Sequence, residues 1–223
     1  MKIWEILLPN FWIQLKVIKH KLYNSLKFLQ KSFLILLFLC FNSYAGNAEK
    51  PNNLVVLGKN NAPVKIKIFS SLTCPHCASF HKNVIPQIEK NYVNSGKVQL
   101  IFIDFPLDLA ALNASKLLHC LEPKKQINFL DIIYENQNKW NSGSNLEEIN
   151  NNLKTIVKDL GVDSTAFKKC LNNEIIESRI LDGRIESQEK YSINSTPTII
   201  INEKKFNGEA NFKNMKKKIE KLI

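Results

Sequence analysis

The hydrophobic and polar positions of this chain follow two different periods. Val64–Phe69 alternates apolar and polar residues, as a half-buried strand does, whereas Val98–Ile103 and the β-branched Thr198–Ile201 are unbroken apolar runs typical of buried strands. Short strands are also predicted over residues 54–57 and at Phe206, each next to a turn. Helical spacing of apolar residues predicts helices over residues 78–90, 107–122, 124–139, 146–160 and 175–190, one that starts at Asp163, and one at the C-terminus.

The predicted order is strand, strand, helix, strand, a block of helices, helix, strand, strand, helix. It indicates an α/β domain, with a mixed central sheet flanked by helices, that an inserted helical domain interrupts. We expect a leader over residues 1–45, a first α/β part over 46–105, the inserted helical domain over 106–174 and a second α/β part over 175–223. The chain beyond the leader is long enough to bury a core of its own.

The N-terminal region has the pattern of an export signal. Phe33–Phe41 is an unbroken apolar run, preceded by Lys27 and Lys31 and followed by the small residues of Ser43–Ala45. The run is shorter than the roughly 20 residues that span a bilayer. We therefore predict a signal peptide cleaved after Ala45, with Ala48 as second choice, and a periplasmic protein. Because Met1–Gln30 is long and partly apolar, retention of the leader as a membrane tether stays open.

The formal net charge of +11 belongs partly to this leader. Residues 1–45 contain six lysines and one glutamate, so residues 46–223 keep a net charge of +6. The densest basic run, Lys213–Lys218, alternates with apolar residues, as a solvated helix face does. The charge therefore gives no reason to expect nucleic-acid binding.

Cys74-Pro75-His76-Cys77 lies between a predicted strand and a predicted helix. A cysteine at the start of a helix is close to unpaired backbone N–H groups and to the positive end of the helix dipole, which favour its thiolate. We therefore predict Cys74 as the nucleophile and Cys77, one turn further, as the resolving thiol. Pro75 and His76 would tune the pair, since proline suits the first helical turn and histidine can add positive charge or a hydrogen bond. A favoured thiolate makes the disulfide more oxidising.

These two thiols could also bind zinc or form an inert structural disulfide. A zinc site would need further ligands, but there is no second Cys-x-x-Cys, and only His81 stands at suitable spacing. An inert disulfide over so short a loop would stabilise the fold little. We expect His81 to be a solvated or packing residue rather than a catalyst.

A proline also opens the predicted strand that starts at Thr198. Next to a redox-active cysteine pair, we predict that the Thr196-Pro197 peptide bond is cis. That conformation leaves the backbone before the proline free to pair with an extended substrate peptide.

Together these motifs resemble the DsbA family of exported thiol-disulfide oxidoreductases. The resemblance is carried by Cys74-Pro75-His76-Cys77, by Phe105-Pro106-Leu107 before the helical block, and by Thr196-Pro197-Thr198, and it covers the chain from Leu54 onwards. It implies a thioredoxin-like fold, catalytic Cys74 and Cys77, a tuning role for His76 and a substrate-binding role for Thr196 and Pro197. Similarity to a subgroup with a second disulfide also implies a structural Cys120–Cys170 bridge, the alternative being two buried free thiols.

One position departs from the family pattern. Family members commonly have a buried acid six residues before the first cysteine of the motif, where this chain has Ile68. If that acid normally moves the proton of the buried thiol, this protein must use water, Lys67 or nothing in its place.

The sequence thus predicts a protein thiol-disulfide oxidoreductase without cofactor or metal, most simply a dithiol oxidase of reduced, unfolded exported proteins. A membrane quinone-linked oxidase as its reoxidising partner is implied by the resemblance alone, and we expect a monomer. Two alternatives stay open: an isomerase or reductase kept reduced by another partner, since exchange chemistry runs both ways, and a non-enzymatic envelope protein or chaperone that retains the fold.

Overall fold

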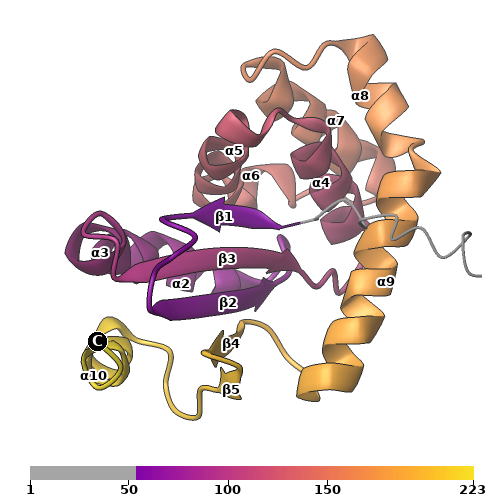
Figure 1. The fold of residues 1–223 in the computed structure, drawn as a ribbon. Coiled ribbons are helices and arrows are strands. Elements are labelled where there is room, and N and C mark those ends of the chain that lie inside the picture. The colour runs from indigo at the N-terminus through magenta and orange to yellow at the C-terminus, as the bar shows by residue number, and fades with distance from the viewer. Residues whose placement is uncertain (1–53) are drawn as a thin grey trace, which may run out of the picture. The chain divides into compact units, whose positions relative to one another are not determined.

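The computed structural model describes residues 54–223, so the predicted leader and its cleavage site lie outside the described residues. A five-stranded mixed sheet in the order β1-β3-β2-β4-β5 forms the centre (Figure 1). β2 and β3 are parallel, and every other neighbouring pair is antiparallel. The strands are β1 (Val55–Leu57), β2 (Val64–Ser70), β3 (Val98–Asp104), β4 (Thr198–Ile201) and β5 (Lys204–Lys205).

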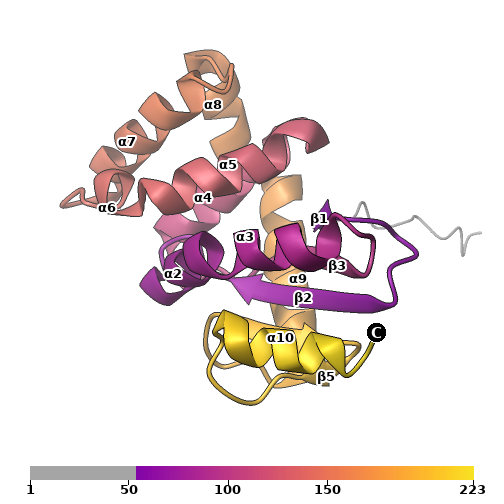
Figure 2. The same ribbon diagram turned by 90° about the vertical axis from the view of Figure 1, so that its left-hand side faces the viewer.

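The alternation along β2 decides what covers each face of the sheet. Ile66 and Ile68 point into the larger core, whereas Phe69 points to the opposite face, where it packs with Ile200 and Phe105. Figure 2 shows α2, α3 and α10 in front of the sheet and α9 behind it. These helices are α2 (Pro75–Asn83), α3 (Ile85–Ile88), α9 (Glu174–Tyr191) and α10 (Phe212–Glu220), with a π-helical turn, η1 (Glu89–Val93), after α3.

Between β3 and α9 the chain forms a block of helices at one end of the sheet, and α9 returns from this block along the sheet to β4 (Figure 1). The block consists of α4 (Leu109–Cys120), α5 (Pro123–Glu135), α6 (Gln137–Trp140), α7 (Leu146–Lys158) and α8 (Ser164–Leu171). Side chains of Asp108 and Asp163 accept backbone N–H groups at the starts of α4 and α8, so Asp163 is the N-cap that the sequence predicts. A disulfide between Cys120 and Cys170 joins these two helices.

The helix predicted over residues 78–90 is the main difference between expectation and structure. It starts at Pro75 and is broken near Val84, after which α3 and η1 follow. Pro86 has no N–H to continue the helical hydrogen bonds of α2, which explains the break. The predicted helix over 124–139 likewise divides at Asn136 into α5 and α6. In residues 54–223, none of the helices has the length and apolar character needed to cross a membrane.

Candidate active site

Cys74 is the N-cap residue of α2. Its side chain is 8% exposed, and its Sγ accepts the backbone N–H of Cys77 at 3.4 Å. Pro75 follows in the first turn, where a missing N–H costs no helical hydrogen bond. The Cys74 Sγ also lies 3.4 Å from the carbonyl oxygen of Thr196, to which its thiol can donate. The sulfur therefore lies between the start of a helix and the loop that enters β4.

Cys77 lies deeper, with 2% of its surface exposed, and both cysteines are free thiols in this structure. The two sulfurs perturb each other in opposite directions. A hydrogen bond from the Cys77 thiol is the main cause that lowers the pKa of Cys74 to about 5, although burial opposes this. The Thr196 side chain lowers it further, followed by the backbone N–H groups of Cys77 and His76. The same hydrogen bond and then burial raise the pKa of Cys77 far above its ordinary value. At neutral pH the pair is therefore a thiolate at Cys74 and a thiol at Cys77.

The other predicted site residues surround this pair. Pro75 and His76 are exposed on the first turn of α2, and Thr196 and Pro197 are half-buried opposite Cys74. The peptide bond between Thr196 and Pro197 is cis. The Thr196 hydroxyl is buried beside the two thiols, and the Thr196 side chain lowers the pKa of both.

Residues of the helical block hold the active-site loop, although no sequence motif marks them. The buried Gln137 side chain, at the start of α6, donates to the carbonyl oxygens of Leu72 (2.8 Å) and Cys74 (3.1 Å). The Thr73 hydroxyl donates to Asp108, the N-cap of α4, at 2.7 Å. A single amide within a helical segment carries no motif, so only the tertiary structure reveals this support.

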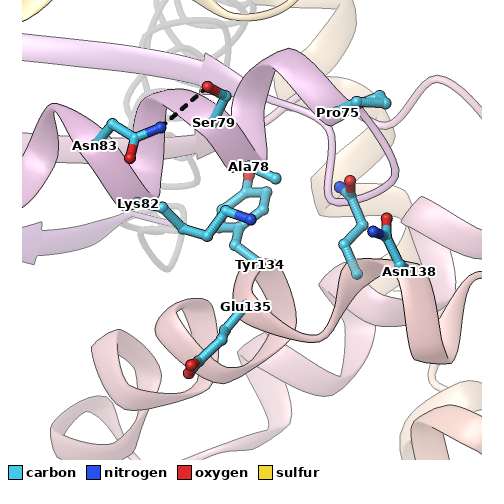
Figure 3. Close-up of a pocket in the computed structure, with 9 residues that line it drawn as sticks. Pro75, Ala78, Ser79, Lys82, Asn83, Tyr134, Glu135 and Asn138 are labelled. Carbon is cyan, nitrogen blue, oxygen red and sulfur yellow. Dashed lines mark hydrogen bonds between the residues drawn. The ribbon is translucent and has the colours of Figure 1, made fainter.

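A groove of about 250 Å³ runs beside the active-site helix, between α2 and the segment from the end of α5 into α6 (Figure 3). Its lining is mostly polar: Ser79, Lys82 and Asn83 belong to α2, and Glu135 and Asn138 to the segment on the other side. The Tyr134 ring lies at its base, below Ala78 and Lys82. Leu107, in the loop that leads into α4, and Leu109, the first residue of α4, are 52% and 63% exposed. A polar groove and exposed apolar side chains are thus both present around the active-site helix and the start of α4.

Ile68 and Lys67 lie on opposite faces of β2. Ile68 is buried in the core on the face of β2 that carries the cysteines, whereas Lys67 bonds to Glu203 and Tyr191 on the opposite face. Lys67 therefore cannot serve the thiols, contrary to one of the options that the sequence left open. His81 is buried, not solvated: its Nε2 lies 2.7 Å from Asp131 Oδ1 and its ring lies 4.8 Å from that of Tyr134. Within residues 54–223 no three His, Cys, Asp or Glu side chains gather as a metal site.

A strand followed by a Cys-x-x-Cys helix, with an acidic N-cap thiol facing a cis-proline loop, defines the class of thioredoxin-fold thiol-disulfide oxidoreductases. The comparisons with known proteins agree. The family model described as thioredoxin matches residues 50–221, and the chain belongs to this family.

The chain is also similar to proteins whose names describe disulfide chemistry. A Bacillus cereus protein named probable disulfide bond formation protein D is 33% identical over 174 residues, which cover 75% of this chain and 77% of the relative. The crystal structure of Wolbachia pipientis alpha-DsbA1 has a TM-score of 0.71 and 32% identity, and covers 77% of this chain and 91% of that chain. Oxidised BdbD from Bacillus subtilis has a TM-score of 0.64 and 26% identity, over 76% and 92% of the two chains. The predicted resemblance to the DsbA family, the thioredoxin-like fold with its helical insertion and the oxidoreductase activity are thereby confirmed.

Proposed function

We propose that this oxidoreductase acts as a dithiol oxidase, which introduces disulfides into exported proteins through Cys74 and Cys77. The observation that carries the proposal is the position of Cys74 as the N-cap of α2, with a pKa of about 5. A thiolate that is stable when free makes the reduced pair the favoured form, so the disulfide tends to take electrons from other thiols.

The reaction then follows from the two sulfurs. A substrate thiolate attacks the Cys74 sulfur of the oxidised pair, forming a mixed disulfide while the bond to Cys77 breaks and Cys77 keeps the electron pair. A second substrate thiolate attacks the substrate sulfur of the mixed disulfide, and Cys74 departs as a thiolate. The substrate gains a disulfide, and the enzyme gains the two electrons. A substrate thiolate attacks Cys74 rather than Cys77, because Cys77 is only 2% exposed and lies deeper than Cys74.

Pro75 and His76 tune the pair from the first turn of α2, and Thr196 and Pro197 hold the substrate strand. The short distance from Cys74 Sγ to the Thr196 carbonyl oxygen supports this, since a peptide paired with the Thr196 backbone would lie beside the sulfur. Cys120–Cys170 acts as a structural bridge within an inserted domain over residues 106–174. Its two cysteines belong to α4 and α8 and are bonded to each other, not to the active-site pair.

The site of action is part of the proposal. The apolar run Phe33–Phe41 and the small residues of Ser43–Ala45 support export to the periplasm and cleavage after Ala45. The proposal includes a monomeric protein and a membrane quinone-linked oxidase as its partner. A protein that makes disulfides catalytically needs such a partner to reoxidise Cys74 and Cys77. Mass spectrometry of the protein from a periplasmic extract tests the export step, and an N-terminus at Met1 would contradict it.

Two measurements test the oxidase activity. Equilibration with glutathione buffers should give a reduction potential nearer to the about −120 mV of strong oxidants than to the about −270 mV of thioredoxin. The protein should also form disulfides in a reduced, unfolded substrate, and Cys74→Ser should abolish this. A strongly reducing potential would indicate the reductase or isomerase, and unchanged activity of Cys74→Ser would indicate a protein that acts without thiol chemistry.

A further inference from the structure

The proposed reaction leaves the proton of Cys77 to be explained. When the disulfide opens, Cys77 leaves with an electron pair at a position that is 2% exposed. Hydrogen bonding with Cys74 and burial raise its pKa, so a bare thiolate there is unfavourable. Cys77 must therefore take up a proton as it leaves, and it must lose one again whenever it attacks the Cys74 sulfur of a mixed disulfide.

A buried carboxyl group without a role in the exchange reaction lies at the end of β3. Asp104 accepts the Ser115 hydroxyl at 2.5 Å and pairs with His119 Nε2 at 2.5 Å. The side chains of Asp104 and His119 are only 8% and 7% exposed. Burying a carboxyl–imidazole pair this deeply adds little net stability, because the loss of hydration offsets the interaction between the two groups. Buried titratable pairs near a reactive group are instead frequent at functional sites.

The register of the sheet places this carboxylate on the side of the thiols. Ser70, at the end of β2, pairs directly with Asp104. Side chains alternate between faces, and Ile68 and Phe102 both belong to the core that contains Cys74 and Cys77. Ser70 and Asp104, each two residues further along, therefore point to that same face.

Tyr134 connects the two groups. It is buried, and burial, then the charge of Cys77 and, less strongly, that of Asp104 raise its pKa, whereas a hydrogen bond with the Ser70 side chain lowers it. A cavity of about 10 Å³, the room of a single water molecule, is lined by Ser70, Asp104 and Tyr134. Tyr134 also lies at the base of the open groove beside α2, which gives the buried side a route to solvent (Figure 3).

The other ionisable groups near the thiols fit the role less well. Lys67 lies on the opposite face of the sheet, as described above. His81 contacts the Tyr134 ring, but its partner Asp131 has a side chain that is 59% exposed, so this pair lies towards the surface. Lys116, on the same helix as His119, is paired with Glu177 of α9.

We propose that Asp104, paired with His119, is the positioning residue that exchanges the proton of Cys77, acting through Tyr134 and the cavity beside it. This inference rests on the proposed function. In the opening step the Cys74–Cys77 bond breaks, the substrate sulfur bonds to Cys74, and Cys77 receives one proton from this cluster, which regains it from solvent. In the reverse step the Cys77 proton returns to the cluster as Cys77 attacks Cys74 and the substrate thiolate leaves.

The test measures the Cys77 step by itself. Reduced protein is converted to the mixed disulfide of Cys74 with glutathione, and the release of glutathione by Cys77 is followed between pH 5 and 8 by acid quenching and mass spectrometry. Asp104→Asn keeps the size of the side chain and removes its charge. We expect it to slow release at least about tenfold and to flatten the pH profile of release, while the alkylation rate of Cys74 is unchanged.

Asp131→Asn is the matched control, because it removes the carboxylate of the other histidine pair beside Tyr134, and it should release glutathione at the parent rate. A folded Asp104→Asn protein with the parent rate and pH profile would overturn the inference, as would an equal slowing by Asp131→Asn. If Asp104→Asn does not fold, His119→Gln is judged by the same criteria. A parent protein that does not exchange with glutathione refutes the proposed function itself, whereas a normal parent with unchanged variants refutes only the role of Asp104.

Discussion

The thiolate of Cys74 should make the reduced protein more stable than the oxidised protein at neutral pH. The perturbation is the change of pH, and the responding group is a sulfur with a pKa near 5 in the folded protein, against an ordinary value of 9.0. A pKa depressed by folding adds stability that is complete above about pH 9, shrinks as the pH falls, and is absent below about pH 5. Cys77 adds nothing below pH 8, because it is a thiol in both the folded and the unfolded chain.

The magnitude follows from about 1.4 kcal/mol per pKa unit. At pH 7, two units above the folded pKa and two below the unfolded one, the thiolate stabilises the reduced fold by about 3 kcal/mol. Closing the disulfide removes this term and, over a four-residue loop, returns about 2 kcal/mol through the entropy of the unfolded chain. The reduced form should therefore be the more stable by about 1 kcal/mol at pH 7, and the order should reverse near pH 6.

Urea unfolding of the reduced and oxidised proteins at half-unit steps from pH 5 to 8 measures this directly. Cys74→Ser serves as the control, because serine keeps an N-cap acceptor but does not ionise in this range. The difference in unfolding free energy between the reduced parent and Cys74→Ser should grow by about 1.4 kcal/mol for each unit by which the pH rises. A difference that stays constant across this range would refute the argument that the helix start holds a thiolate.

Three further predictions concern parts of the fold outside the thiol pair. Replacing Cys120 and Cys170 by alanine opens a link across 50 residues, and should lower the free energy of unfolding in urea by about 4 kcal/mol without changing alkylation of the active-site thiol; slower alkylation would contradict a purely structural bridge. Gln137→Leu leaves two carbonyl oxygens of the active-site loop without their hydrogen-bond donor and should lower the free energy of unfolding by about 1–3 kcal/mol. A thermal unfolding midpoint equal to that of the parent would contradict the supporting role of Gln137. Glu203→Gln breaks a half-exposed ion pair with Lys67 and should cost at most about 1 kcal/mol at pH 7. Because this carboxylate has its pKa lowered to about 2, the loss should vanish as the pH falls from 4.5 towards 2, and a loss that persists there would show that the charge is not responsible.

The strands and the active-site motif could be predicted because their signals are local. The alternation over Val64–Phe69 survives as β2, with Ile66 and Ile68 inside. Asp163 caps α8 because an aspartate before a helix can bond its first backbone N–H groups whatever the rest of the chain does. The position of Cys74 at a helix start likewise depends only on the residues beside it.

The break in the first helix shows where periodicity misleads. Apolar residues continue at helical spacing past Val84, so the pattern predicts one helix to residue 90. Spacing describes which face is buried, but it does not register that Pro86 lacks an N–H. The structure keeps the apolar face and divides the helix, as the backbone chemistry of proline requires.

The environment of the buried thiol could not be predicted from one strand alone. Position 68, six residues before Cys74, is an isoleucine, so the sequence alone indicates that the buried acid is missing. In the structure Ile68 pairs with Phe102 and Ser70 with Asp104. Asp104 is therefore two residues, or about 7 Å, nearer to the carboxyl end of the sheet than the Ile68 position, and on the neighbouring strand.

Parallel pairing explains why that displacement matters. The carboxyl ends of β2 and β3 lie at the same edge of the sheet, so the residue that ends β3 lies beside the loop that leads from β2 to Cys74. His119 and Ser115 reach this edge from α4, which starts after the loop that follows β3. A carboxylate can thus be close to the thiols without being close to them in sequence. If Asp104→Asn slows the release of glutathione as expected, the apolar residue at position 68 does not leave the thiol without an acid, because the neighbouring strand supplies one.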